Sequence, residues 1–370
     1  MFYVGKPAVK DFIDRRRELS RLLEGVKLGQ SYALIAPRRY GKTSLILKAL
    51  ETLAREGDFF TVYVDVMRCG ASWRALAEGI LDAVYENLGL EGFVRRLRHG
   101  FSLELSITLK YKGLEVEPSI SLLKGKDDRA LLEHALSLPD KVASKKGKKA
   151  VVAIDEVGEL SGAEPEVLGF FRALAQRQEN TVYLFAGSQE SIMKRIFADT
   201  GGVFYQFANL LFLEGLDKQD FHKHMVKSFG EQGLEVSPEV LEETYTLLRG
   251  NPHYTKKLAH LALLMCKKET REKFDMELLA RAMGLLLEEE RPYLELLVEK
   301  LHRRKHAVEV VRAVALGDSP YSAVRESVSR QRVSQLLKSL ELDGFIKRLE
   351  RGKYILTDPV LELYFKYSPS

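Results

Sequence analysis

The stretch from Ser31 to Lys48, SYALIAPRRYGKTSLILK, combines residue types that bind anions with a spacing that brings them together. Apolar residues come first in a run and then recur at helical spacing, which predicts a short strand, a tight turn and a helix. Gly41, Lys42 and Thr43 stand at the turn. Wrapped backbone N–H groups, the positive end of a helix and one reaching ammonium group together make a phosphate site.

Each residue of this turn has a defined role in a phosphate site. Gly41 has no Cβ, so its backbone can approach a phosphate oxygen closely. Lys42 is expected to lie across the β- and γ-phosphates, and the Thr43 hydroxyl to coordinate Mg²⁺. Ala36 stands where the pattern G-x-x-x-x-G-K-[ST] has its first glycine, and we expect Pro37 to make the turn accessible by fixing φ. The predicted nucleotide-binding residues of the loop are Pro37, Arg38, Arg39, Tyr40, Gly41, Lys42, Thr43 and Ser44.

Two acidic residues end a second apolar run, at 150–156. Such a run predicts a buried strand that carries Asp155 and Glu156 to the carboxyl edge of a parallel sheet, where ligands bind in this fold class. Asp155 would hold the hydration shell of Mg²⁺, and Glu156 would orient and deprotonate the attacking water. An acidic pair is common at strand ends, but combined with the phosphate loop it predicts Mg²⁺-dependent hydrolysis of a nucleoside triphosphate.

A third apolar run, Thr181–Gly187, is followed by Ser188 and Gln189. In a parallel sheet these polar side chains would also lie at the carboxyl edge. Either one could contact the γ-phosphate or the water, and either could instead cap the next helix; the residues leave this open. The predicted catalytic residues are Lys42, Glu156 and Ser188.

Further strands and helices must position these groups. Residues 59–66 form another near-continuous apolar run, and 210–213 predict a fifth strand. Asp14 is expected to cap the helix before the loop, and Ser72 the helix after the second strand. Alternation of strand and helix predicts an α/β domain with a parallel sheet.

Residues 101–122 interrupt this alternation. Their apolar residues recur with period two on both sides of Lys112-Gly113, which predicts an inserted β-hairpin. A cover strip over the domain and a flap that binds a partner are both open interpretations.

From Asp217 the pattern is helical, with helices expected at about 217–229, 238–248, 252–268 and 275–289. The segment Arg249–Tyr254 breaks this series. Turn-forming residues explain the break by themselves, and a lid that closes over nucleotide is the functional alternative.

The last eighty residues or so predict a separate small domain. Helices at about 293–303, 306–316, 320–327 and 330–343 lead into two short strands, which is the order of a winged helix-turn-helix. Contact with DNA through 320–354 and contact with a protein partner are both open. The basic residues that favour DNA are Arg330, Arg332 and Lys338 on the last helix, with Lys347, Arg348, Arg351 and Lys353 on the strands.

Composition agrees with a globular protein, with 45% hydrophobic and 29% charged residues in 370. The net charge of +5 is too mild to indicate nucleic acid by itself. No run approaches the roughly twenty apolar residues that span a bilayer, so we expect a cytoplasmic protein that does not enter a membrane. Cys69 and Cys266 are expected to be core thiols rather than a disulfide or a metal pair.

With these residues in place, the chain resembles the archaeal ATPase family, within the STAND branch of AAA+-like P-loop ATPases. The resemblance rests on F-I-D-R at 12–15 with E-L at 18–19, A-P-R-R-Y-G-K-T at 36–43, the Asp155-Glu156 pair, A-G-S at 186–188, G-N-P at 250–252 and L-T-D-P at 356–359. It implies a sheet ordered 5-1-4-3-2, a helical lid, a C-terminal winged helix, and ATP at the junction of sheet and lid.

The resemblance also implies roles for single residues. The 12–19 segment, with Arg15, would lie near the adenine, Ser188 would occupy the sensor position, and Pro252 would pack by the nucleotide. Related chains often carry an arginine shortly before the fifth strand, where this chain has Gln206. Slow or partner-dependent hydrolysis is therefore expected.

The resulting hypothesis is an Mg²⁺- and ATP-dependent switch built from a P-loop domain at 1–216, a helical lid at 217–290 and a winged helix domain at 291–370. A GTPase is the enzymatic rival, because Asp155–Gly158 fits D-x-x-G and Asp217–Asp220 nearly fits N-K-x-D. A DNA-binding module with nucleotide as a structural ligand is the non-enzymatic rival. The oligomeric state is not predicted.

Overall fold

The computed structural model describes residues 15–89, 125–163, 165–324, 328–350 and 352–367. A five-stranded parallel sheet forms its centre, with neighbouring strands in the order β2-β3-β4-β1-β5. This is the predicted order 5-1-4-3-2 read from the opposite edge. The predicted hairpin at 101–122 and the predicted cap Asp14 lie outside the described residues. The strands are β1 (Tyr32–Ile35), β2 (Phe59–Asp65), β3 (Lys149–Asp155), β4 (Thr181–Gly187) and β5 (Asn209–Phe212).

Helices cover both faces of the sheet because the central strands are apolar on both sides. On one face, α1 (Arg16–Lys27) and α2 (Lys42–Glu56) bury a cluster that includes Leu22, Leu45 and Leu184. The other face packs against the remaining helices of this part, with Phe171 and Phe185 near the centre of the cluster. These helices are α3 (Val66–Cys69), α4 (Trp73–Glu86), α8 (Asp128–Lys145), α9 (Leu160–Ala163), α10 (Pro165–Ala175) and α11 (Glu190–Phe197).

The helices after β5 begin close to their predicted positions. They are α12 (Lys218–Gly230), α13 (Pro238–Leu248) and α14 (Pro252–Lys268), and each has a polar residue that caps its first turn. Asp217, Ser237 and Asn251 accept hydrogen bonds from backbone N–H groups of those turns. A small parallel pair that was not predicted, β6 (Glu235–Val236) and β7 (Lys273–Phe274), joins the ends of this bundle.

One long helix replaces two predicted ones. Helices were expected at 275–289 and 293–303, but α15 runs without interruption from Met276 to His302 with Pro292 inside it. An interior proline removes a helical hydrogen bond at a cost of about 3 kcal/mol. Leu286 and Leu294 are fully buried on either side, and burial of each such side chain stabilises by about 1.5–3 kcal/mol. Packing therefore outweighs the helix-breaking signal.

The last segment has the arrangement of a winged helix. Helix α16 (Ala307–Leu316) and helix α17 (Arg330–Leu342) precede an antiparallel ribbon of β8 (Ile346–Glu350) and β9 (Lys353–Leu356). The helix predicted at 320–327 is wrong in its described part, since 321–324 form turns. Ser322 donates to the carbonyl of Ser319 there, and such side-chain bonds compete with a helix. A final helix, α18 (Pro359–Tyr367), was not predicted.

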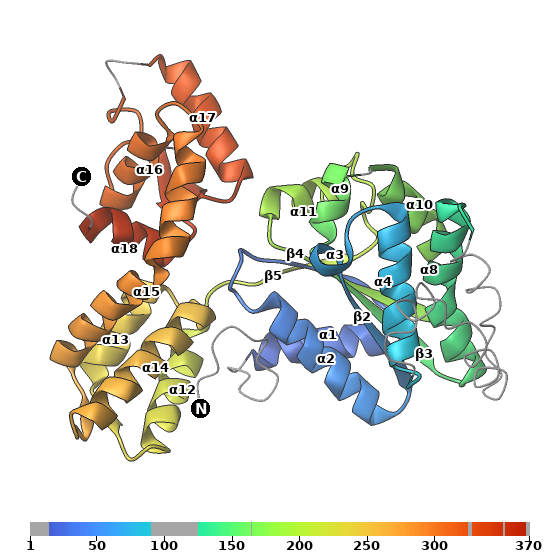
Figure 1. Cartoon of the computed structure of the whole chain (residues 1–370), viewed down its shortest axis with the longest axis horizontal. Helices are drawn as coiled ribbons and strands as arrows, with labels where there is room; N and C mark the ends of the chain where they lie inside the picture. Colours follow the sequence, from blue (N-terminus) through green and yellow to red (C-terminus); the bar gives the residue numbers. More distant parts are fainter. Residues whose placement is uncertain (1–14, 90–124, 164, 325–327, 351, 368–370) are drawn as a thin grey trace.

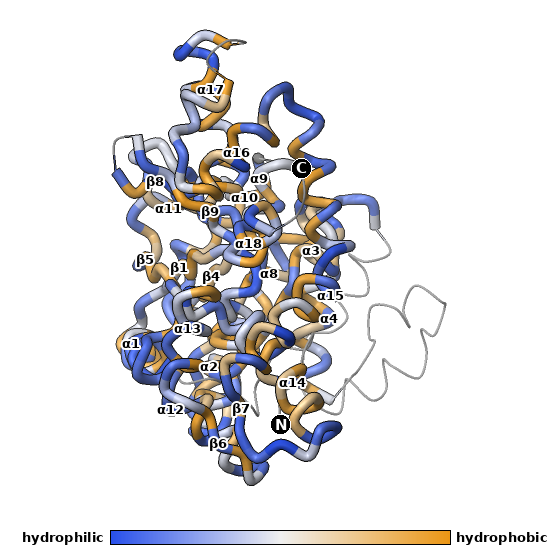
Figure 2. The backbone as a smooth tube through the Cα atoms, turned by 90° about the vertical axis from the view of Figure 1, so that its left-hand side faces the viewer, coloured by the Kyte–Doolittle hydropathy of each residue, from blue (hydrophilic) through white to orange (hydrophobic). Residues whose placement is uncertain are grey.

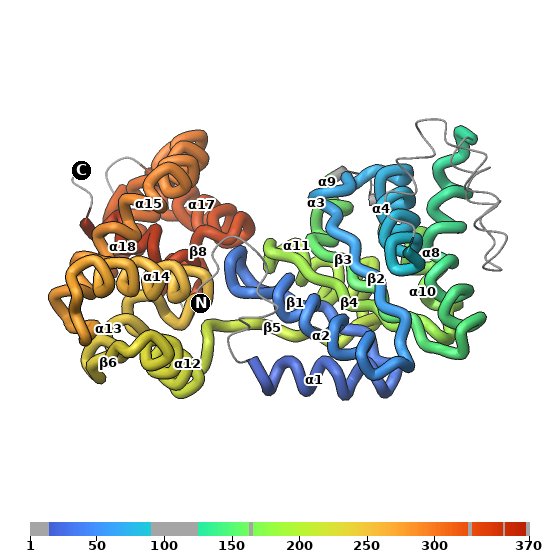
Figure 3. The backbone as a smooth tube through the Cα atoms, turned by 60° about the horizontal axis from the view of Figure 1, so that its bottom comes forward, coloured from blue at the N-terminus to red at the C-terminus, as the bar shows by residue number. Residues whose placement is uncertain are grey.

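Helices α12 to α18 share one continuous buried cluster, which extends from Leu216 to Phe365. The predicted boundary between residues 290 and 291 falls inside α15, which crosses from one group of helices to the other. Figure 1 shows the sheet with its helices on one side and the α12–α18 body on the other, and Figure 3 shows the same two bodies from a second direction.

Hydrophobic and hydrophilic residues alternate along the tube throughout the molecule, as amphipathic elements require (Figure 2). In the described part of the chain, no helix combines the length and the hydrophobicity needed to cross a membrane. Both cysteines carry free thiols; Cys266 is buried and Cys69 is half-buried.

Candidate active site

The loop between β1 and α2 carries two left-handed residues. Gly41, the residue before the first turn of α2, has φ 85°, and Arg39 has φ 72°. Left-handed residues alternating with others turn successive backbone N–H groups toward one point, which creates an anion-binding nest. Ala36 is not among the residues with positive φ, so an alanine fits this position without strain. The loop's need for a left-handed residue is met at Arg39 and Gly41 instead.

Lys42 folds back over the loop. Its Nζ donates to the carbonyl of Ala36 at 2.9 Å and to that of Pro37 at 3.2 Å, and lies 4.0 Å from Oε1 of Glu156. Burial lowers the pKa of Lys42, against the opposing influence of Glu156 and Asp155. The ammonium group therefore lies between the loop and the acidic pair, and its predicted contact with the β- and γ-phosphates stays a prediction.

Thr43 and Asp155 meet across the sheet edge. The Thr43 hydroxyl donates to Oδ2 of Asp155 at 2.6 Å, and the hydroxyl of Tyr63 donates to the same oxygen at 3.0 Å. Asp155 is buried, so both donors stabilise its negative charge. Carboxylate and hydroxyl oxygens are the hard donors that Mg²⁺ takes, usually one or two from protein with water and phosphate completing the shell. The residues present fit that ion.

Glu156 is held by Ser188. Oε2 of Glu156 accepts one hydrogen bond from the Ser188 hydroxyl at 2.9 Å and another from the Ser188 N–H at 3.0 Å. Glu156 itself has φ 52°, a left-handed conformation that a non-glycine residue rarely adopts. The side chain of Gln189, the residue before α11, makes no capping bond. Of the two polar residues considered after β4, Ser188 is the one that contacts the acidic pair.

Arg15 contacts the loop from outside. Its guanidinium donates to the carbonyl of Tyr40 at 3.1 Å and to that of Glu214 at 2.6 Å, and it pairs with Glu18 at 2.8 Å. Burial lowers the pKa of Arg15, and Glu18 opposes this. Arg15 thus joins the phosphate loop to the segment that enters α12.

Arg39 directs its side chain away from the loop interior. Its Nη1 donates to the hydroxyl of Tyr254 at 2.9 Å and to Oε2 of Glu290 at 2.6 Å, and its guanidinium lies 4.0 Å from the ring centre of Tyr293. The Tyr40 hydroxyl is 3.4 Å from the carbonyl of Thr357, so the loop contacts both α14–α15 and the winged helix segment. The side chain of Arg38 is exposed, and Ser44 is half-buried in the first turn of α2.

The break at 249–254 brings Pro252 beside the loop. Arg249 and Gly250 are both left-handed, with φ 50° and 66°. A Cβ on Gly250 would lie 2.7 Å from the carbonyl oxygen of Leu216, so only glycine fits there. The ring of Pro252 lies 3.9 Å from the position of a Cβ on Gly41. Turn chemistry therefore explains the sequence and also delivers the start of α14 to the phosphate loop.

A cavity of about 770 Å³ lies beside this site, lined on the loop side by Pro37, Arg38 and Tyr40. The phosphate loop, the end of β4, helix α15 and the winged helix segment all line it. Its lining includes Pro37, Arg38, Ser188, Tyr293, Lys338 and Asp358.

A family model described as an ATPase domain predominantly from Archaea matches residues 12–258. The chain belongs to this archaeal ATPase family. No curated relative matches the sequence.

Solved structures share the fold of this chain over nearly its whole length. The Walker-type ATPase of Pyrococcus abyssi is 22% identical, covers 99% of this chain and 100% of its own, and has a TM-score of 0.73. The ORC2 protein of Aeropyrum pernix, in complexes with ADPNP and ADP, is 15% identical, with coverages of 98% and 93% and a TM-score of 0.58. The ORC1 protein of Aeropyrum pernix, in complex with DNA, is 17% identical, with coverages of 98% and 94% and a TM-score of 0.52. These TM-scores and coverages show a shared fold.

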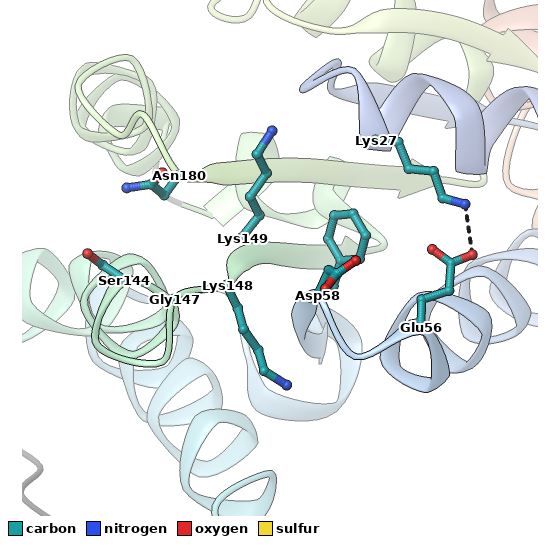
Figure 4. A pocket seen from close by; sticks show the side chains of 9 residues that line it. Lys27, Glu56, Asp58, Ser144, Gly147, Lys148, Lys149 and Asn180 are labelled. Atoms are coloured by element: carbon teal, nitrogen blue, oxygen red, sulfur yellow. Dashed lines mark hydrogen bonds and ion pairs between the residues drawn. The ribbon is translucent and has the colours of Figure 1, made fainter.

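The opposite edge of the archaeal ATPase sheet carries a separate hollow (Figure 4). Lys148 and Lys149 lie there near the start of β3, and Lys27 pairs with Glu56 at 2.8 Å. Gln206 lines another hollow at this edge, beside the first residues of β4 and β5. Gln206 is therefore remote from the phosphate loop.

Several residues of the site in this archaeal ATPase were not predicted. Tyr63 lies in an apolar strand, where its ring resembled ordinary core. Tyr254 and Glu290 come from the distant helices α14 and α15, and Asp358 immediately precedes α18. The available signals were the segment Arg249–Tyr254 and the L-T-D-P motif at 356–359, which contain Tyr254 and Asp358. Asp217 caps α12 through bonds from the N–H groups of Gln219 and Asp220, which accounts for the fragment that resembled N-K-x-D.

Proposed function

We propose that this archaeal ATPase binds Mg²⁺-ATP at the carboxyl edge of its sheet, hydrolyses it, and uses the cycle as a conformational switch. The observation that carries the proposal is a set of three contacts at one edge of the sheet: Thr43 with Asp155, and both Lys42 and Ser188 with Glu156. These residues follow three different strands. An anion nest, a cation and two acids with separate partners are the set that triphosphate hydrolysis needs.

The contacts divide the chemical work. The backbone N–H groups around Arg39 and Gly41 would bind phosphate oxygens. Lys42 would give up its hydrogen bonds to the loop carbonyls and instead contact the β- and γ-phosphates. Mg²⁺, when bound, supplies charge neutralisation across the phosphates, with Thr43 and Asp155 as its protein-side partners. Glu156, oriented by Ser188, would take the proton of the attacking water.

The switch in this proposal is the body formed by α12–α18 relative to the sheet. The proposed lid at 217–290 and winged helix domain at 291–370 share a core, so we expect them to move together. Ser191 donates to the carbonyl of Leu342 at 2.6 Å, which adds a contact close to Ser188 to those that the phosphate loop makes with this body. Loss of the γ-phosphate would therefore alter both the contacts of the phosphate loop and the contact of Ser191 with the α12–α18 body.

Turnover in this proposal is slow or depends on a partner. Efficient phosphoryl transfer in this class uses an arginine that reaches the transferred phosphate. Gln206 lies at the opposite end of the strands from the phosphate loop, so neither it nor an arginine at that position reaches the transferred phosphate. A cation supplied by a partner molecule would raise the rate.

The test is calorimetric titration of the folded chain with ATP and Mg²⁺, followed by competition between ATP and GTP. We expect ATP uptake at one site and weaker displacement by GTP. Absence of triphosphate uptake contradicts the proposal, and tighter binding of GTP favours the GTPase rival.

Contact with DNA is a second candidate, favoured by the exposed basic residues of the winged helix segment. Arg330, Arg332 and Lys338 are exposed on α17, and Lys347 and Arg348 on β8. The related ORC1 fold is known in complex with DNA. Lys338, Lys347 and Arg348 line the cavity, so full access to them requires the two bodies to separate. Duplex binding measured across a salt series tests this, since phosphate contacts give a steep negative slope.

A further inference from the structure

A chain of hydrogen bonds joins the phosphate loop to the last helix of the molecule. Arg39 donates to the hydroxyl of Tyr254 at 2.9 Å, and that hydroxyl donates to Oδ2 of Asp358 at 2.7 Å. The three residues lie in the loop, in α14 and immediately before α18. Tyr254 is fully buried, so water does not compete for its hydroxyl.

Both ends of this chain are fixed by further contacts. Oδ1 of Asp358 accepts from the N–H groups of Val360 at 2.9 Å and Leu361 at 3.1 Å, and thereby caps α18. At the other end, the buried carboxylate of Glu290 accepts from Arg39 at 2.6 Å and from Lys257 at 2.7 Å. The guanidinium of Arg39 therefore has one orientation only in which all its partners are satisfied.

The backbone of Arg39 is the part that matters for nucleotide. Its φ of 72° is unfavourable for any residue with a Cβ, and it persists only where surrounding contacts hold it. Together with Gly41, this residue forms the nest whose N–H groups face a phosphate. Gly41 adopts its conformation freely, whereas Arg39 needs its side-chain anchors.

We propose that Asp358 is a positioning residue for nucleotide binding, which acts through Tyr254 to hold Arg39 in the left-handed conformation of the anion nest. This inference rests on the proposed function, because it identifies the residues through which the winged helix segment would regulate the proposed ATP site. Docking of α18 preorganises the loop, and ATP in turn favours the docked state by the same factor.

Two variants interrupt the hydrogen bonds from Arg39 through Tyr254 to Asp358 and keep the other contacts of Arg39 and Asp358. Tyr254→Phe removes only the hydroxyl, which leaves the Arg39–Glu290 ion pair and the cap of α18 intact. Asp358→Asn keeps an oxygen for the cap, since asparagine caps helices as well as aspartate does, but presents an NH₂ group to Tyr254. Tyr183→Phe is the matched control, because it removes a buried hydroxyl that donates to Gln178 at 2.6 Å, far from the loop.

Two readouts are measured on the full chain. The Kd for ATP with Mg²⁺ is expected to rise about tenfold in Tyr254→Phe and Asp358→Asn, and to stay unchanged in Tyr183→Phe. Hydrogen exchange at the amides of residues 38–43, measured without nucleotide, is expected to be faster in the first two variants only. In an Arg39→Gly background, where glycine adopts positive φ without anchors, Tyr254→Phe should add nothing to the Kd.

The outcomes separate this inference from the function on which it rests. Equal exchange and equal Kd in Tyr254→Phe and Tyr183→Phe overturn the inference. An additive effect of Tyr254→Phe in the Arg39→Gly background also overturns it, because the hydroxyl would then act on some other group. If exchange at residues 38–43 is faster in Tyr254→Phe and Asp358→Asn but the wild-type chain takes up no ATP, the structural link is supported and the proposed function is overturned instead.

Discussion

The hydroxyl of Thr43 donates a 2.6 Å hydrogen bond to Oδ2 of Asp155, a residue 112 positions later in the chain. This bond joins the start of α2 to the end of β3 and sets the spacing between the phosphate loop and the acidic pair. When Mg²⁺ binds, interactions of these two oxygens with the metal site would replace this hydrogen bond, because both oxygens face the site.

Thr43→Val tests this relationship. We expect the variant to lose most of the gain in ATP affinity that Mg²⁺ gives the wild type, because valine keeps the shape but not the oxygen. Thr43→Ser is the matched control and should retain the gain. The measurement is the Kd for ATP with Mg²⁺ and with EDTA; a full magnesium effect in Thr43→Val would remove this residue from the metal site.

Lys42→Ala should abolish ATP binding. The ammonium group is buried against the loop, and no other described cation lies as close to both the loop carbonyls and Glu156. Loss of its charged contacts should raise the Kd at least about a hundredfold, or about 2.7 kcal/mol. Lys48→Ala, which removes a lysine paired with Glu51 further along α2, serves as the control in the same titration. Near wild-type affinity in Lys42→Ala would argue against this loop as the nucleotide site.

Glu156→Gln should bind ATP and fail to hydrolyse it. Glutamine keeps a carbonyl that can accept from Ser188 but cannot take a proton from water, so kcat should fall by about 10²- to 10⁴-fold. Phosphate release and ATP affinity, measured side by side, separate the two effects. Glu159→Gln, a neighbouring acid outside the proposed chemistry, should turn over normally. If Glu156→Gln hydrolyses ATP at the wild-type rate, another group is the base.

The ion cluster around Glu290 gives a pH dependence of stability. Burial alone would raise the pKa of Glu290, but the contacts with His253, Lys257 and Arg39 outweigh it and hold the pKa below its ordinary value of 4.5. A carboxyl group with a lowered pKa contributes stability above its unfolded pKa and loses it as the pH falls through the folded one. The contribution should therefore be complete at pH 7 and decline below pH 4.5.

Glu290→Gln measures that contribution. At pH 7 the variant should be less stable than the wild type by about 3 kcal/mol, because it leaves buried cations without their partner. The difference should shrink as the pH is lowered below 4.5. Denaturant unfolding across this range gives both values. Glu289→Gln, at an exposed carboxylate 3.1 Å from the same Lys257, should change little at any pH, and a constant gap for Glu290→Gln would contradict the assignment.

The placement of the phosphate loop and the acidic pair at one edge of the sheet was predictable because it depends on short segments. The loop at 36–43 and the acids at 155–156 each follow a strand that local hydrophobicity reveals, and parallel strands place such ends along one edge. Family resemblance supplied the strand order, which adjacent runs of apolar residues do not determine.

The contacts between the two bodies could not be predicted. Arg39 meets Tyr254 and Glu290 across separations of 215 and 251 residues, and no local pattern encodes such a meeting. Pro292 suggested a break where packing maintains α15, and Tyr63 looked like an ordinary strand residue. Long-range packing determines these features, and the local propensities of a single sequence contain no information about it.

The unbroken course of α15 makes it a lever. Glu290 is clamped to the phosphate loop near the middle of this 27-residue rod, which continues into the winged helix segment. From that pivot to His302 the arm measures roughly 18 Å, so a tilt of about 10° at the nucleotide would displace its tip by roughly 3 Å. In the proposed switch, a small adjustment beside the γ-phosphate would thereby be magnified into a shift large enough to make or break a macromolecular contact.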